Sequence, residues 1–507
     1  MVQGLARSGL RVVMDVVYNH TTASGQGEKS VLDRVVPGYF HRLNGNGDIE
    51  TSTCCSNTTS EHAMMEKLMV DSLLTWARDY KVDGFRFDLM GHHTKANLLK
   101  IRDALQALTP RMDGVDGSRI YLYGEGWNFG EVTNDARFVQ AAQFNMGDTG
   151  IGTFNDRIRD AVRGGGPFDG GINHVINQGF INGLFYDLNA ENLGGPGEFD
   201  RLLLSADRIR VGLAGNLADY TLVDRNGDTV IGAQVDYNGS PTGYVSDPQE
   251  VINYAAAHDN ETLFDINLYK APLGTSMDDR VRIQNMGISL VALGQGIPFF
   301  HAGQDMLRSK SMDRNSFNSG DWFNHLDFSY ELNGFGRGLP PQGDNGFNRV
   351  VAGPLLANPD LVPARGHIVK AVQHFLEMLE IRKSSRLFRL RTADAVREQV
   401  KFHNTGLAQI LGLIVMSLSG NAVDPGIDCD SGLDRGIRQI VVLFNATTEA
   451  VSFTVNEFAG QRFRLHPVQR SSGDPVVRGA RFNREGGTFT VPGRTTVVFI
   501  AVGRGDG

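Results

Sequence analysis

The stretch GLRVVMDVVYNH, residues 9–20, has the pattern of a buried parallel strand. Apolar residues fill positions 12–17 apart from Asp15, and the run ends in Tyr18, Asn19 and His20. A continuous apolar run of this length predicts a strand that is covered on both faces of a sheet. Because an unpaired buried charge is costly, Asp15 is expected to have a partner elsewhere in the chain.

The segments that follow alternate between helix and strand patterns. The spacing of apolar residues predicts helices at 61–80, 94–108, 278–295 and 366–385, and strands at 82–90, 120–127, 250–260 and 297–306. This alternation is typical of a parallel α/β fold. From about residue 392 the pattern changes to short strands separated by turn residues, which predicts an antiparallel β-sandwich. The expected domains are therefore 1–391 and 392–507.

The composition narrows the class of partner. The 507 residues are 41% hydrophobic and 21% charged, as in an ordinary globular protein. There are 57 acidic and 49 basic residues without a long basic cluster, which argues against nucleic acid or an anionic membrane as partner. No apolar run approaches the roughly 20 residues that cross a bilayer. The first residues lack a signal-peptide pattern, but the sequence predicts no compartment.

The cysteines do not form a recognisable framework. Cys54, Cys55 and Cys429 match neither a disulfide scaffold nor a zinc pattern. The adjacent pair has two readings that the sequence leaves open: a vicinal disulfide with strained geometry in an exported protein, or two reduced thiols in a loop.

Three carboxylates follow or finish predicted strands: Asp88, Glu125 and Asp259. The carboxyl ends of strands are where barrel enzymes hold their active residues. A lone Asp at such a place more often caps a helix, but here Arg86 and two histidines are expected at the same end of the sheet. Clustered charges of this kind favour a functional site over a purely structural role.

The carboxylate pair suits glycoside hydrolysis with retention. Such enzymes need an ionised nucleophile and a protonated acid about 5–5.5 Å apart. Asp88 lies two residues after Arg86, whose charge keeps a carboxylate ionised, so Asp88 is the predicted nucleophile. Glu125, flanked by glycines and followed by Trp127, is the predicted acid/base. Asp259 is expected to hold sugar hydroxyls and to stabilise the transition state.

Longer motifs resemble a known family. The segments DVVYNH, GFRFDLM, YGEGW and HDN occur in this order and resemble the four conserved regions of the α-amylase superfamily. The surrounding segments VLDRVVPGYFHRL, TCCSNTTSEHAMMEKL and RSKSMDRNSFNSGDWFN look like those of type I pullulanases and limit dextrinases. The resemblance covers essentially the whole chain. It implies a (β/α)8 TIM barrel that hydrolyses α-1,6-glucosidic branch points in pullulan, starch or glycogen-derived dextrins.

The resemblance also implies roles for individual residues. The nucleophile, acid/base and transition-state stabiliser correspond to Asp88, Glu125 and Asp259. His20 and His258 correspond to the histidines that bind glucose. Arg86 corresponds to the arginine that orients the nucleophile, and Trp127 to an aromatic wall on the leaving-group side. Asp15 is the expected partner of Arg86, and Asn19 supports the site beside it. Asn315 and Asp321 are expected to line the substrate cleft.

The start of the chain departs from the family pattern, which places two barrel strands ahead of residues 15–20. We therefore expect a barrel that lacks its first two strands and begins in its second helix. Alternative functions are an isoamylase- or amylase-like α-glucan hydrolase, or an inactive glucan-binding fragment. The chemistry requires no cofactor, although calcium often supports such folds, and no metal ligands can be assigned from the sequence. A branched α-glucan is the expected partner of a monomeric chain.

Overall fold

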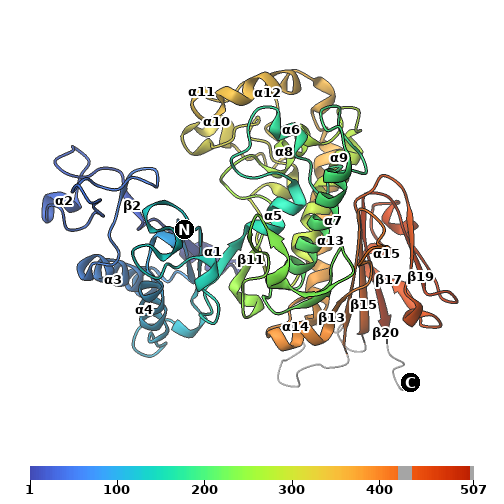
Figure 1. Ribbon diagram of the computed structural model, residues 1–507, viewed down its shortest axis with the longest axis horizontal. Helices are drawn as coiled ribbons and strands as arrows, with labels where there is room; N and C mark the ends of the chain where they lie inside the picture. The colour runs from blue at the N-terminus through green and yellow to red at the C-terminus, as the bar shows by residue number, and fades with distance from the viewer. Residues whose placement is uncertain (421–436, 503–507) are drawn as a thin grey trace. The chain divides into compact units, whose positions relative to one another are not determined.

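The computed structural model describes residues 1–420 and 437–502 (Figure 1). Cys429 lies outside the described residues. The chain forms two compact units. The first contains Met1–Phe154 and Tyr244–Ile252, and the second contains Asn155–Gly243 and Asn253–Gly507. Among the described residues, none of the helices is both long enough and apolar enough to cross a membrane.

The first unit is built on a sheet that follows the predicted alternation. Its strands are adjacent in the order β1 (Val13–Val16), β4 (Gly84–Phe87), β5 (Tyr121–Gly124), β6 (Gly152–Asn155) and β11 (Val251–Asn253). The pairs β1–β4, β4–β5 and β5–β6 are parallel. The predicted parallel α/β pattern is therefore confirmed for this part of the chain.

Strand β1 is more exposed than its apolar sequence predicts. Val13 is 40% exposed and Val17 is 49% exposed, and the side chain of Asp15 is 53% exposed. In the order of the sheet β1 is an edge strand with β4 as its one neighbour, so within the described residues its other edge is uncovered. The prediction that residues 12–17 are buried on both faces is wrong for these positions.

Two helices pack on the sheet of the first unit, α3 (Ala63–Tyr80) and α4 (Lys95–Gln106). Thr94 caps α4 by accepting a hydrogen bond from the amide of Asn97, and the Asn97 side chain returns the contact. The helices share a core with the strands, made of Met65, Met69, Leu73, Ala77, Phe85, Phe87, Leu98, Ile101, Leu105 and Leu122. Apolar residues at helical spacing bury one face of each helix, as predicted.

The second unit contains most of the remaining helices. They include α5 (Asp156–Arg163), α6 (Asn173–Ile176), α7 (Pro196–Leu213), α8 (Leu263–Lys270), α9 (Met277–Ala292), α10 (Asp321–Asn324), α12 (Arg349–Leu356) and α13 (Arg365–Ser384). The predicted helices at 278–295 and 366–385 are confirmed to within a few residues by α9 and α13. The predicted strands at 250–260 and 297–306 are much shorter, since β12 is only Ile297–Pro298. The Phe299 amide donates to the Asn253 carbonyl at 2.8 Å.

The C-terminal part of the second unit consists of two antiparallel sheets (Figure 1). One contains β13 (Val400–Phe402), β14 (Leu413–Ser419), β15 (Ile437–Asn445), β20 (Thr495–Val502) and β17 (Phe463–Leu465) in that order. The other contains β16 (Val451–Thr454), β19 (Thr488–Val491) and β18 (Arg481–Asn483). Val441 and Phe499 of the first sheet share a core with Phe489 of the second. The helix α14 (Ala393–Gln399) precedes these strands, where the sequence had predicted strands from residue 392.

Candidate functional site

Strand register brings the first two predicted carboxylates together. Phe87 is aligned with Gly124 across β4 and β5, so the next residues, Asp88 and Glu125, lie at equivalent positions where the two strands end. The Glu125 amide donates to the Phe87 carbonyl at 3.0 Å, which continues the ladder. Because parallel strands end at one edge of a sheet, both side chains reach the same edge.

The guanidinium of Arg86 connects three carboxylates. Its Nη1 lies 2.8 Å from Asp15 Oδ1 and 3.0 Å from Asp88 Oδ1, and its Nη2 lies 2.8 Å from Glu125 Oε1. The predicted pairing of Asp15 with Arg86 is therefore present. Burial lowers the pKa of Arg86, but the charge of Glu125, followed by that of Asp15 and Asp88, outweighs burial, and the pKa is raised. Arg86 is a permanent cation shared by three anions.

Asn19 links the predicted nucleophile to His20. The Asn19 Nδ2 donates to the Asp88 carbonyl at 2.8 Å and to Asp88 Oδ2 at 2.9 Å, and Asn19 Oδ1 lies 2.6 Å from His20 Nδ1. Since an amide oxygen only accepts, Nδ1 of His20 must carry the proton, and Nε2 of the neutral ring carries a lone pair. Burial lowers the pKa of His20 against the opposing charge of Asp88, so the ring is neutral near neutral pH.

Glu125 is held by N–H donors on both oxygens. Oε1 contacts Arg86, and Oε2 accepts a hydrogen bond from the Leu89 amide at 2.9 Å. These donors suit a carboxylate, whereas a general acid must carry a proton on one of these oxygens. Trp127, two residues later, is half-buried. A Cβ at Gly91 would lie 2.0 Å from the Trp127 carbonyl oxygen, so only glycine allows this close passage.

The other predicted residues lie in the second unit. His258 and Asp259 are on the loop after β11, with side chains 55% and 60% exposed, and His258 Nε2 lies 3.6 Å from Asp259 Oδ1. The Asn260 amide lies 3.5 Å from Oδ1 of Asn315, which places Asn315 beside this loop. Asp321 is the exposed first residue of α10.

Lys310 is a further residue of this loop environment that the sequence did not single out. Its Nζ donates to the carbonyls of His258 and Asn260, at 3.2 and 2.7 Å, on either side of Asp259. The side chain is buried, and burial is the main cause that lowers its pKa. A lysine in a polar segment normally indicates the surface, so no local pattern predicts this contact.

Two buried histidines follow Asp88 and make the first unit sensitive to acid. Burial lowers the pKa of His92 to about 4 and that of His93 to about 3. In the unfolded chain both have a pKa of about 6.5. Because the folded values are lower, the stability that the neutral rings contribute is complete above pH 6.5 and is lost as the pH falls towards 4. By pH 5 each histidine should cost about 2 kcal/mol of unfolding free energy.

We therefore expect His93→Leu to reduce the loss of stability between pH 7 and pH 5 by about 2 kcal/mol. Urea unfolding at the two pH values measures this difference. The exposed His62 of the same unit provides the control, and His62→Gln should leave the pH dependence as in the wild type. An unchanged pH dependence in His93→Leu would contradict the assignment.

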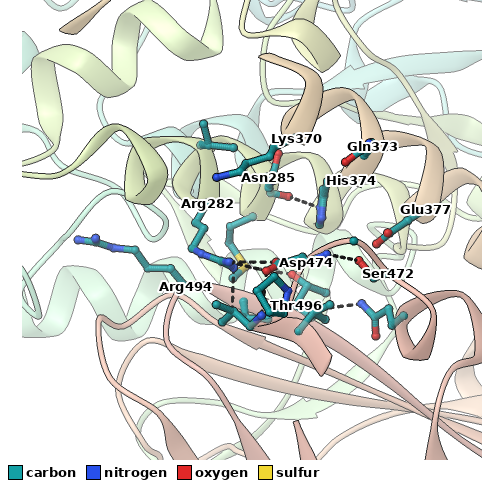
Figure 2. Close-up of a pocket in the computed structure, with 18 of the residues that line it drawn as sticks. Arg282, Asn285, Lys370, Gln373, His374, Glu377, Ser472, Asp474, Arg494 and Thr496 are labelled. Carbon is teal, nitrogen blue, oxygen red and sulfur yellow. Dashed lines mark hydrogen bonds and ion pairs between the residues drawn. The ribbon is translucent and has the colours of Figure 1, made fainter. Parts of the chain in front are cut away.

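A separate cavity of about 310 Å³ lies in the second unit, between α9, α13 and the segments at 469–477 and 494–496 (Figure 2). The arginines and the lysine that line it are paired: Arg282 with Asp474 at 2.8 Å, Lys370 with Asp278 at 2.6 Å, and Arg494 with Asp279 at 3.1 Å. The predicted catalytic carboxylates are not among the residues that line it.

The structure brings together one group of potential metal ligands among the residues that it describes. Within residues 1–420 and 437–502, the one cluster of at least three potential His, Cys, Asp or Glu ligands is His20, Cys54 and Cys55. Calcium takes oxygen ligands, so nitrogen and sulfur donors do not fit it. Both cysteines are free thiols. Burial, followed by the neighbouring Cys55, raises the pKa of Cys54 to about 11.

Comparison with known proteins gives consistent matches. Residues 330–502 match the family of alpha-1,6-glucosidases, pullulanase-type, C-terminal. Pullulanase 1, chloroplastic, of Arabidopsis thaliana is 51% identical over 503 residues, which are 99% of this chain and 52% of that protein. A pullulanase of Klebsiella pneumoniae is 42% identical over 98% of this chain and 44% of its own length.

Solved structures agree with the sequence matches. The maltotriose complex of PulA from Klebsiella pneumoniae superposes with a TM-score of 0.91 at 40% identity, covering 100% of this chain and 52% of that one. The described α/β fold with its sheet-rich C-terminal region therefore matches that of a pullulanase. The chain spans about half the length of the relatives that it matches. By sequence and structure, the chain belongs to the pullulanase-type family of alpha-1,6-glucosidases.

Proposed function

We propose that this chain carries the catalytic carboxylates of a retaining hydrolase that cleaves α-1,6-glucosidic branch linkages in pullulan and related α-glucans. The observation that carries the proposal is the Arg86 guanidinium, whose two terminal nitrogens hold Asp88 and Glu125 side by side. A retaining enzyme requires two neighbouring carboxyl groups, about 5–5.5 Å apart, and a guanidinium that both share favours such an arrangement. We infer the α-1,6 linkage and the glucan substrate from the names of the relatives.

In the proposed reaction, Asp88 attacks the anomeric carbon while the glycosidic C–O bond breaks. Glu125 gives its proton to the departing oxygen, and a covalent glucosyl–Asp88 ester results. Glu125 then takes a proton from water, and the resulting hydroxide displaces Asp88 to release the sugar. Arg86 and Asn19 each occupy one oxygen of Asp88, so the carboxylate is held against rotation while it attacks. No step uses a cofactor.

The general acid must carry a proton, whereas the present contacts of Glu125 stabilise its carboxylate form. Both oxygens contact N–H donors, and the positive charge of Arg86 favours the ionised form, so protonation weakens these contacts. Burial of the site by a bound glucan favours the neutral acid, because desolvation disfavours the charged form. We therefore propose that Glu125 becomes protonated when substrate binds, and that Arg86 then forms ion pairs mainly with Asp88 and Asp15.

The remaining roles complete the proposed site. Asp259 stabilises the transition state, His20 and His258 hold the glucose before the scissile bond, and Trp127 forms the wall of the leaving-group side. Asn315 and Asp321 contribute to the cleft. For the fold, we propose that the parallel sheet is part of a (β/α)8 barrel. Among the described residues β1 has a strand neighbour on one edge only, which supports this proposal because a closed barrel pairs both edges of every strand.

The experiment that tests the function measures reducing ends released from pullulan. The chain is assayed alone and joined to the part of the Klebsiella pneumoniae pullulanase that the match leaves uncovered, here called the chimera. We expect maltotriose from pullulan and no comparable hydrolysis of linear α-1,4-glucan. Hydrolysis of the linear glucan at the same rate would instead indicate an amylase-like activity, and a folded chimera without activity on either glucan would contradict the proposal.

The contact of Lys310 with the Asp259 loop gives a prediction in the chimera. Lys310→Met removes both hydrogen bonds to the carbonyls that flank Asp259, and the loop should lose its fixed position. A misplacement of about 1 Å costs about 10²-fold in rate, so we expect kcat to fall by about that factor. KM should change less, because the other predicted glucan contacts remain.

The control is Lys370→Met, which removes an exposed lysine paired with Asp278 in the same unit. Its kcat should match that of the wild type. If Lys310→Met is folded, as judged by circular dichroism, and keeps the wild-type kcat, the positioning role is wrong.

A further inference from the structure

The loop before β3 (Ser56–Asn57) presents two thiols to His20. Strand β2 (His20–Thr21) pairs with β3 in antiparallel register, with His20 opposite Asn57 and Thr21 opposite Ser56. Cys54 and Cys55 directly precede β3, so the ladder holds them next to the histidine. The Cys54 Sγ lies 3.3 Å from His20 Nε2.

The loop that carries the thiols is tied down on its other side. The Asn57 side chain donates to Ser52 Oγ at 3.0 Å and to the carboxylate of Glu131, and Ser52 donates to the same carboxylate. The Cys55 amide donates to Thr53 Oγ1 at 3.4 Å. These hydrogen bonds fix the loop, and the loop holds the two thiol side chains beside His20.

We infer that His20, Cys54 and Cys55 form a binding site for one thiophilic divalent cation such as Zn²⁺. The potential ligand atoms of the three residues all lie within 4.8 Å of one another. In a tetrahedral zinc site, bonds of about 2.0 Å to nitrogen and about 2.3 Å to sulfur put these ligand atoms about 3.5 Å apart. The observed separation of 3.3 Å between Cys54 and His20 is close to that spacing.

The histidine is oriented as a metal ligand needs. A ligating imidazole normally donates its other N–H to a carbonyl or carboxylate, which fixes the tautomer and the ring. Here Asn19 Oδ1 receives the Nδ1 proton at 2.6 Å, and the lone pair on Nε2 faces Cys54. One nitrogen and two sulfur donors favour zinc or cadmium over calcium and magnesium.

Access to the site is open, because Cys54 is exposed and neither His20 nor Cys55 is fully buried. The thiols release their protons to water as the ion binds, and three protein ligands leave a fourth position for water. The bound ion occupies the Nε2 of His20. If the proposed function holds, this nitrogen is then denied to the glucose, and the ion inhibits hydrolysis in competition with the glucan.

The test uses Cd²⁺ as the probe on the reduced chain of residues 1–507, without substrate. Ultraviolet sulfur-to-cadmium charge-transfer absorption should saturate at one ion per chain. Loss of a residue that hydrogen-bonds a metal ligand costs about 10–100-fold in metal affinity, so loss of a direct ligand in Cys54→Ser, Cys55→Ser or His20→Ala should cost at least as much. Cys429→Ser is the matched control and should bind as tightly as the wild type.

A second measurement needs no variant. Saturating Cd²⁺ should protect Cys54 and Cys55 from alkylation by iodoacetamide, as read by peptide mass spectrometry, and should not change the extent of alkylation at Cys429. Unchanged binding in the Cys54→Ser and Cys55→Ser variants, or equal alkylation with and without the ion, overturns the site. Because both readouts need no glucan, failure of the metal site is distinct from failure of the proposed hydrolase.

Discussion

Asp88→Asn should abolish debranching by the chimera, with kcat on pullulan lowered by about 10⁴- to 10⁶-fold, as when a covalent nucleophile is removed from an enzyme. The asparagine side chain has the size of the aspartate side chain but carries no negative charge and cannot form the glucosyl ester. Arg86 would retain Asp15 and Glu125 as partners, so the fold of the first unit should survive. The measurement is the rate of reducing-end release at saturating pullulan.

The matched control is Asp15→Asn, which removes another carboxylate from the same guanidinium. Its side chain is 53% exposed, against 21% for that of Asp88, and no role in bond breaking is proposed for it. We expect less than about a tenfold change in kcat, since a partly exposed ion pair contributes little. Equal losses in the two variants would mean that Asp88 acts only through Arg86, and the nucleophile would have to be sought elsewhere.

Glu125→Gln distinguishes the role of Glu125 from that of Asp88. Removal of a general acid/base costs about 10²–10⁴-fold, less than removal of the nucleophile. A substrate with a good leaving group needs little protonation, and azide needs no general base. With both present, turnover of Glu125→Gln should rise towards that of the wild type, whereas Asp88→Asn should stay inactive.

Removal of Arg86 should have the largest effect on stability. Arg86→Met leaves Asp15, Asp88 and Glu125 without their shared cation, and Glu125 is only 7% exposed. Breaking a buried ion pair by deleting one partner costs about 3–5 kcal/mol, because the remaining charge is left uncompensated. We expect a loss of this size in the unfolding free energy at pH 7, measured by urea unfolding.

The pH dependence distinguishes charge repulsion from lost packing. Without the cation, the folded state of Arg86→Met should hold protons on its clustered carboxylates more tightly than the unfolded chain does. Its deficit relative to the wild type should therefore shrink as the pH falls from 7 towards 5. A deficit that is constant with pH would indicate packing alone. Arg78→Met, which removes an exposed arginine paired with Asp79, should unfold like the wild type.

Much of the first unit follows from residue patterns. Period-two alternation and the apolar runs correctly place β4 and β5, and with them Asp88 and Glu125 at adjacent strand ends. The sharing of Arg86 by Glu125 as well as Asp15 depends on the lateral order of three strands, which no local pattern contains. The sequence motifs also point to the partner of Asp15, but not to the exposure of its side chain at the sheet edge.

The second unit shows where such patterns stop being informative. The apolar run before His258 predicted a long strand, but only Val251–Asn253 keeps strand hydrogen bonds, and the functional loop begins soon after it. Lys310 reaches this loop from about 50 residues further along the chain. A contact of that kind depends on how two irregular segments close on each other, and hydrophobic periodicity carries no information about it.

The unequal count of charges around Arg86 has a consequence for the sugar. One guanidinium faces three carboxylates, so even with Glu125 in its acid form Asp15 and Asp88 leave an excess of negative charge, fixed in place by the strands. As the glycosidic bond breaks, positive charge grows on the anomeric carbon and ring oxygen. A fixed negative potential costs the protein folding energy in advance, and it lowers the barrier at that moment without any reorganisation of solvent.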